Sequence, residues 1–184
     1  TVLWRAASDK AAFWCGWLFG FGQFFTGFIW MGEAFFVDAA KFLWLLPFAI
    51  TLPPAAHALF VALAALAAHR GRQRFALGPI GAALLLALCL AGMAYLRSTI
   101  LTGLPWNLPV MGWASWLYLA QPVAYLGVHG LGLLALISAL LLAVADERAR
   151  LVALALPVLA FIVSLVHLHV LATPAPPHTP VSLV

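Results

Sequence analysis

Five long apolar stretches, separated by short connections that carry most of the charged residues, dominate the pattern of hydrophobic and polar positions. Each stretch exceeds the roughly 20 residues that an α-helix needs to cross a membrane. Backbone groups in lipid must be hydrogen-bonded internally, which favours helices. The pattern therefore predicts an all-α integral membrane domain over residues 1–172, with about five transmembrane helices. The predicted spans are 11–36, 42–68, 75–96, 121–145 and 151–172.

Glycines and prolines refine this prediction. Gly16 and Gly20 lie on one helix face, and small residues at this spacing let another helix approach closely in lipid. We expect this face to pack against a helix, with a lipid-access groove as the alternative. Pro47 and the Pro53-Pro54 pair are expected to kink or break the second span, because proline lacks an N–H group and clashes with the preceding turn.

Composition excludes a soluble domain, since 66% of the residues are hydrophobic and 8% are charged, against roughly 25% charged in soluble domains. The net charge of +4 does not indicate a nucleic-acid partner, because the charges lie in the connections. Seven of the nine basic residues fall on one side of five spans, which the positive-inside rule makes cytoplasmic. The start of the chain is then cytoplasmic, and the 101–106 loop and the C-terminus lie on the outer side. The seven are Arg5, Lys10, Arg70, Arg72, Arg74, Arg148 and Arg150.

Ionisable residues near the ends of the spans are candidates for function, because charge is costly in a membrane. Glu33 has either a buried, substrate-facing role or a solvated one. Asp38 and Lys41 have the spacing of an ion pair one helical turn apart. Arg97 either snorkels to the interface or offers its planar donors to a phosphate or carboxylate.

The residues predict neither a metal site nor a cofactor. His167 and His169 fall on different helix faces, and Cys15 and Cys89 lie inside apolar stretches as small hydrophobes. No Ser-His-Asp set, phosphate-binding loop or pair of catalytic carboxylates can be assembled. On these grounds alone the function stays open.

Two segments outside the spans are distinctive. Residues 101–107 combine turn-forming Gly and Pro with a tryptophan and polar side chains. Residues 173–180 indicate a stiff proline-rich linker, and residues 181–184 alternate like a β-strand. We expect this tail to be a linker and the first strand of a domain that is absent here.

These motifs together resemble bacterial apolipoprotein N-acyltransferases, and the resemblance covers nearly the whole chain. The most specific motif is LTGLPWN at 101–107, which is similar to an LTGFPWN segment of that family. The others are GWLFGFG at 16–22 and GFIW at 27–30, which look like its third membrane helix, YLR at 95–97, GVHGL at 127–131, and VSLV at 181–184, which matches the strand that opens its periplasmic nitrilase-like domain.

The resemblance implies a multi-pass protein of the bacterial inner membrane that transfers an acyl chain from a phospholipid to the N-terminal cysteine amine of a lipoprotein. The reaction would run through a thioester on a cysteine, which belongs with a glutamate and a lysine to the nitrilase-like domain. We therefore expect no catalytic residue in this chain, and no activity from the chain alone.

The membrane part would then hold the phospholipid and lipoprotein substrates as a monomer, without a cofactor. Arg97 would lie near a headgroup, and Trp106 would guide acyl chains or support the mouth of the active site. The candidates for this lipid support are Trp30, Glu33, Arg97, Thr102, Pro105, Trp106 and Asn107.

Two other functions compete with this hypothesis. A transporter-like bundle would show discontinuous helices with polar linings at mid-membrane. A non-catalytic membrane scaffold would keep the lipid-binding surface without the chemistry.

Overall fold

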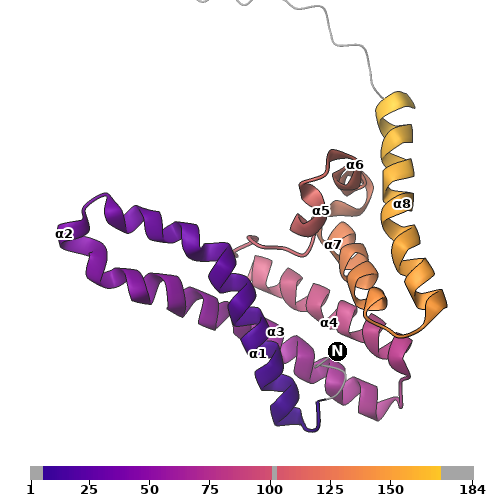
Figure 1. The fold of residues 1–184 in the computed structure, drawn as a ribbon, viewed down its shortest axis with the longest axis horizontal. Helices are drawn as coiled ribbons and strands as arrows, with labels where there is room; N and C mark the ends of the chain where they lie inside the picture. The colour runs from indigo at the N-terminus through magenta and orange to yellow at the C-terminus, as the bar shows by residue number, and fades with distance from the viewer. Residues whose placement is uncertain (1–5, 101–102, 171–184) are drawn as a thin grey trace, which may run out of the picture.

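The computed structural model describes residues 6–100 and 103–170, and this part of the chain folds into helices and their connections, without a β-strand (Figure 1). The predicted linker and strand at 173–184 lie outside the described residues. In chain order the elements are α1 (Asp9–Phe28), η2 (Ile29–Phe36), α2 (Ala39–Phe42), η3 (Leu43–Leu45), α3 (Leu46–Arg74), α4 (Pro79–Thr99), α5 (Met111–Ala114), α6 (Leu117–Ala120), α7 (Val123–Leu142) and α8 (Glu147–Val170), where η marks a 3₁₀-helix.

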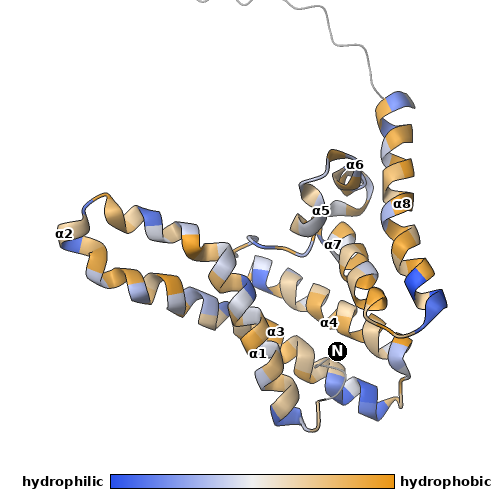
Figure 2. Ribbon diagram, viewed as in Figure 1, coloured by the Kyte–Doolittle hydropathy of each residue, from blue (hydrophilic) through white to orange (hydrophobic). Residues whose placement is uncertain are grey.

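Five helical stretches within the described residues are long and apolar enough to cross a membrane, which confirms the predicted all-α fold with five spans. Apolar residues run along these helices and hydrophilic residues gather near their ends (Figure 2). The fifth helix begins one turn earlier than expected, because the Asp146 carboxylate accepts a hydrogen bond from Ala149 N at 2.8 Å and caps it. The stretches are Asp9–Phe36, Ala39–Arg74, Pro79–Thr99, Val123–Leu142 and Glu147–His169.

Helices α1 and α3 form a long hairpin with α2 at its tip, on the left of Figure 1. A Cβ atom added to Gly16 would lie 2.6 Å from Ala65 Cβ, and one added to Gly20 would lie 2.8 Å from Val61 Cβ. The glycine face therefore packs directly on α3, which confirms the predicted helix contact. Helix α4 packs against α3 and α7, and α8 packs against α7.

Of the predicted kink or break at the prolines, the break does not occur. Pro47 lies in the first turn of α3, where no intrahelical N–H is required, and the helix continues through Pro53 and Pro54 to Arg74. Pro54 is fully buried, so packing against neighbouring elements holds this part of the helix in place. The interruption comes earlier, at the 3₁₀-helix Leu43–Leu45.

A second interruption of a transmembrane stretch is in α7, where Gly127 has a φ of 65° and a ψ of 172°. Only glycine adopts this backbone conformation readily. The break lies one turn after Val123, where α7 begins. A transporter-like bundle would need the break at mid-membrane instead.

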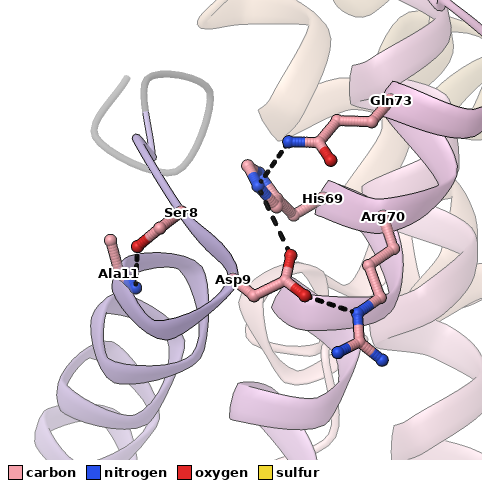
Figure 3. A network of polar contacts seen from close by, with 6 residues as sticks. All are labelled: Ser8, Asp9, Ala11, His69, Arg70 and Gln73. Atoms are coloured by element: carbon pink, nitrogen blue, oxygen red, sulfur yellow. Dashed lines mark hydrogen bonds and ion pairs between the residues drawn. The ribbon is translucent and has the colours of Figure 1, made fainter.

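A polar network joins the beginning of α1 to the end of α3 (Figure 3). Asp9 Oδ2 accepts a hydrogen bond from Arg70 Nε at 2.8 Å, and Asp9 Oδ1 lies 3.8 Å from His69 Nε2. Gln73 Nε2 lies 2.9 Å from the same ring nitrogen. Ser8 caps α1 by accepting a hydrogen bond from Ala11 N at 3.2 Å. These contacts hold the start of α1 against the end of α3. Helix α4 begins shortly after this point, and the candidate site lies where α4 ends, near Thr99.

Candidate functional site

Arg97, in the last turn of α4, holds the loop that follows it. Its Nη1 donates to Leu104 O at 2.6 Å and its Nη2 donates to Trp106 O at 2.7 Å, while Leu104 N donates to Arg97 O at 3.3 Å. The side chain is buried, with 4% of its surface exposed. Because guanidinium donors are planar and fixed, two carbonyls bound in this way set the path of the loop. Arg97 does not snorkel, and these two nitrogens are engaged by the chain itself.

The turn after α4 requires glycine at position 103. Gly103 has a φ of +72°, and its N–H donates to Ile100 O at 2.8 Å. A Cβ atom there would overlap Ser98 O, so a side chain would be excluded by the backbone as well as by the dihedral angle. Thr102, the neighbouring candidate, lies outside the described residues.

Asn107 turns the loop back onto α1. Its φ of 52° falls in the left-handed region, where asparagine is among the few tolerated residues. Its side-chain amide rests on Gly27: a Cβ atom added there would lie 2.7 Å from Asn107 Cγ and still closer to Nδ2. Asn107 Nδ2 is buried and has no hydrogen-bond partner among the described residues. A buried donor without a partner is costly and is expected to serve a ligand or an ordered water.

Trp106 and Trp30 join the loop to η2. Their ring centroids are 4.9 Å apart with an interplanar angle of 33°, and 44% and 53% of their surfaces are exposed. Indoles prefer the interface between lipid and water. The structure thus brings together Trp30, Arg97, Trp106 and Asn107, four of the seven candidates from the sequence.

The other described candidates lie at the periphery. Pro105 is exposed in the loop, and Glu33 is exposed on η2 and lines neither of the hollows described below. The predicted ion pair between Asp38 and Lys41 is wrong: Lys41 N donates to Asp38 O at 3.1 Å, but the Lys41 ammonium lies over the Phe42 ring, 5.0 Å from its centroid. Asp38 precedes the short helix α2 instead of lying within it, so the expected helical spacing of the side chains is lost.

The loop between α4 and α5, which Arg97 holds through Leu104 O and Trp106 O, is called the clamped loop below. Two hollows lie beneath it. The first, called the α1–α7 cavity, has a volume of about 350 Å³ and is bounded by α1, α3, α4, α5, α7 and the loop. The second, called the α3–α4 groove, has a volume of about 600 Å³ and is bounded by α3, the end of α4 and the loop. Both volumes are in the range of roughly 300–1,000 Å³ typical of ligand pockets. Arg97 and Phe60 line both of them.

Both hollows are mainly apolar with a few polar groups. The cavity contains Gln23, Arg97 and Asn107 among apolar side chains such as Leu90 and Met93. In the groove, the polar side chain besides Arg97 is His57, whose Nδ1 lies 2.7 Å from Pro53 O and whose ring packs against Phe24 and Phe28. An apolar hollow with few polar groups suits a lipid tail with a polar end.

Arg97 is a buried cation without a carboxylate partner among the described residues. Its contacts are two backbone carbonyls and the Phe24 ring, whose centroid is 4.9 Å from Cζ. Neutral partners reduce the cost of burying the charge, but they do not cancel it. The site therefore favours an anionic group near Arg97.

Sequence reasoning missed two parts of this site. Gly27 is seven residues after Gly20 and so lies on the same face of α1, and this spacing was the available signal for a contact there. The position of Phe60 between the two hollows could not be predicted, because one more aromatic residue in an apolar span is not distinctive in the sequence. No group of three potential metal ligands occurs among the described residues.

Comparison with known proteins places these features in a family. The family model described as Apolipoprotein N-acyltransferase N-terminal domain matches residues 1–141. No solved structure matches the chain.

Curated relatives carry the same name, apolipoprotein N-acyltransferase. The one from Caulobacter vibrioides is 43% identical over 124 residues, which is 66% of this chain and 22% of that protein. The one from Allorhizobium ampelinum is 44% identical over 126 residues, 68% of this chain and 23% of that protein. The one from Rhodopseudomonas palustris is 43% identical over 124 residues, 67% of this chain and 22% of that protein. The chain thus matches less than a quarter of the length of these relatives.

Proposed function

The chain belongs to the apolipoprotein N-acyltransferase family, and on this premise we propose that it forms the part of such an enzyme that lies in the bacterial inner membrane and holds its lipid substrates. The reaction would move an acyl chain from a phospholipid to the N-terminal amine of a lipoprotein. We assign no catalytic residue to this chain.

The observation that carries the proposal is the position of the clamped loop over two apolar hollows, with Arg97 lining both. A transferase that takes its substrates from a bilayer must hold acyl chains beneath the interface and present their ester group at it. Trp106 and Trp30 mark interface depth beside the loop. In the proposed orientation the start of α1 is cytoplasmic and the loop is periplasmic.

A chimera tests the proposal. Residues 6–141 of this chain would replace the matching stretch of the Caulobacter vibrioides relative, and N-acylation of a diacylglyceryl lipopeptide would be measured in inverted and detergent-solubilised membranes. We expect transfer in the intact chimera. We expect a loss of at least about tenfold in Arg97→Gln, because the loop is no longer fixed and a misplacement of the order of an ångström costs about 10²-fold in rate.

Arg74→Gln is the matched control, since Arg74 is exposed at the opposite end of α3. Folded, membrane-inserted amounts of each variant would be equalised by size-exclusion chromatography in detergent. A chimera that folds and inserts but transfers no acyl chain contradicts the proposal, as does a folded Arg97→Gln variant with an unchanged rate.

A further inference from the structure

The two hollows beneath the loop share one wall. Phe60 of α3 and Arg97 of α4 line both, and no other residue does so within the described part of the chain. The α1–α7 cavity lies on the side of this wall that faces α1 and α7, whereas the α3–α4 groove is formed by α3, the end of α4 and the loop alone. A ligand with two apolar branches could therefore pass Phe60 on both sides.

The hollows run in the same direction and to a similar depth. Helices α3 and α4 are joined by a short connection and run antiparallel (Figure 1). Counted away from this connection, along α3 from Arg74 and along α4 from Pro79, Ala56 corresponds to Arg97 and Leu63 corresponds to Leu90. The cavity reaches Leu90, and the groove reaches Leu63. Each distance is seven residues, which is about 10 Å along a helix. Both hollows thus extend from the loop towards the middle of the membrane.

The charge at the shared wall points to an anion. Arg97 is 4% exposed, donates only to neutral carbonyls in the contacts described, and has no carboxylate partner among the described residues. The residue lines both hollows. A phosphate there would neutralise a cation that is otherwise buried without a counter-charge. Asn107 lines the cavity at the same end.

We propose that one glycerophospholipid binds astride Phe60, with one acyl chain in the α1–α7 cavity, the other in the α3–α4 groove and the phosphate beside Arg97. This inference deepens the proposed function and rests on it for the lipid class. Phe60 is the residue that keeps the two chains apart. Such a seat would select a diacyl lipid over a single-chain one.

The test uses photoactivatable phosphatidylcholine with a diazirine at the end of one acyl chain only, either the sn-1 or the sn-2 chain. The protein is reconstituted in phosphatidylcholine vesicles that contain a trace of the probe, and crosslinked peptides are mapped. We expect the two probes to label different hollows: one labels peptides of α4 and α7, and the other labels the 56–63 segment of α3. A diacylglycerol probe without phosphate should label both hollows less.

Tryptophan substitutions decide whether one lipid occupies both hollows. Ala139→Trp fills the cavity and Ala56→Trp fills the groove, and both positions are exposed alanines that tolerate a large side chain. If one lipid spans the wall, each substitution should lower labelling in both hollows by about tenfold, because excluding two methylene groups already costs that much. Ala155→Trp, on the exposed surface of α8 and lining neither hollow, is the matched control.

Three outcomes would overturn the inference: both probes label the same hollow, each substitution lowers labelling only in its own hollow, or neither substitution changes labelling. The second outcome would show two separate lipids. Phe60→Ala should let each probe label both hollows. Crosslinking needs no acyl transfer, so the two proposals can fail separately. If the chimera is active but crosslinking gives one of these three outcomes, the inference is refuted and the proposed function stands. If crosslinking gives the expected pattern but the folded chimera is inactive, only the proposed function is refuted.

Discussion

Gly27 of α1 provides the space into which the Asn107 amide of the loop fits. A Cβ atom at Gly27 would lie 2.7 Å from Asn107 Cγ, below any normal contact distance. Asn107 is itself fixed by its left-handed backbone, with a φ of 52°. The contact therefore links the first transmembrane helix to the loop that follows the third, across about 80 residues of sequence.

The first prediction concerns this contact. Gly27→Ala should destabilise the protein by about 1–3 kcal/mol, because the added methyl group forces the loop or α1 to move. For a chain of this size the melting temperature should fall by about 2–4 °C for each kcal/mol. Thermal unfolding in detergent, followed by circular dichroism, measures the change.

Gly22→Ala is the control for Gly27→Ala. No atom lies within 4 Å of a Cβ at Gly22, on the same helix. There the alanine should stabilise the helix by roughly 0.5–1 kcal/mol, since glycine is the weaker helix former. Equal effects at the two positions would show that the loop does not rest on Gly27.

The second prediction concerns the two carbonyls held by Arg97. Arg97→Gln should loosen the loop, because hydrogen bonds from a charged donor contribute about 1.5–3 kcal/mol each. Arg97→Lys should rescue only part of the effect, since a lysine ammonium is a point charge and lacks the planar pair of donors. Hydrogen exchange of the 103–110 amides, above all that of Leu104 N–H, measures the loosening.

Arg74→Gln, at an exposed position on α3, serves as the comparison for Arg97. It should leave exchange of the 103–110 amides unchanged. Full protection of these amides in Arg97→Gln would mean that the loop keeps its path without the clamp.

The third prediction concerns the packing of α1 on α3. Gly16→Leu should cost at least about 3 kcal/mol, because a side chain there meets Ala65 Cβ and the backbone of α3, which cannot rotate away. Gly92→Leu, on α4, has open space around its Cβ and should instead stabilise the helix by roughly 0.5–1 kcal/mol, since leucine is a better helix former than glycine. The ratio of folded to aggregated protein after detergent extraction distinguishes the two. Similar losses at both positions would contradict the close contact.

The spans and the helix contact could be predicted from the sequence because length, apolarity and glycine spacing are local signals. The sequence also identified residues 101–107 as the candidate loop, since Gly, Pro and Trp are unusual together between two spans. The clamp could not be predicted in the same way. Arg97 binds backbone carbonyls, which every residue carries, so no partner side chain identifies the contact.

The errors of prediction also have physical causes. Pro53 and Pro54 were expected to kink or break α3, but the helix does not break there, because packing around the fully buried Pro54 holds it together. The break at Gly127 was not expected, because a glycine within a span is more often a packing residue than a hinge. Helices α5 and α6, of four residues each, are too short to show a periodicity.

The fourth prediction concerns the ion pair between Asp9 and Arg70 at the start of α1. Side-chain exposures of 44% and 64% place it in contact with water or headgroups, so its coupling energy in a double-mutant cycle of Asp9→Asn and Arg70→Gln should be about 0.2–1 kcal/mol. Salt at about 1 M should remove most of it, because the Debye length falls to about 3 Å. Asp38 forms no ion pair among the described residues, so Asp38→Asn measures the effect on stability of losing a carboxylate alone. A coupling of several kcal/mol that salt leaves unchanged would mean that another surface covers the pair, and would make this end of the hairpin an interface instead of a solvated surface.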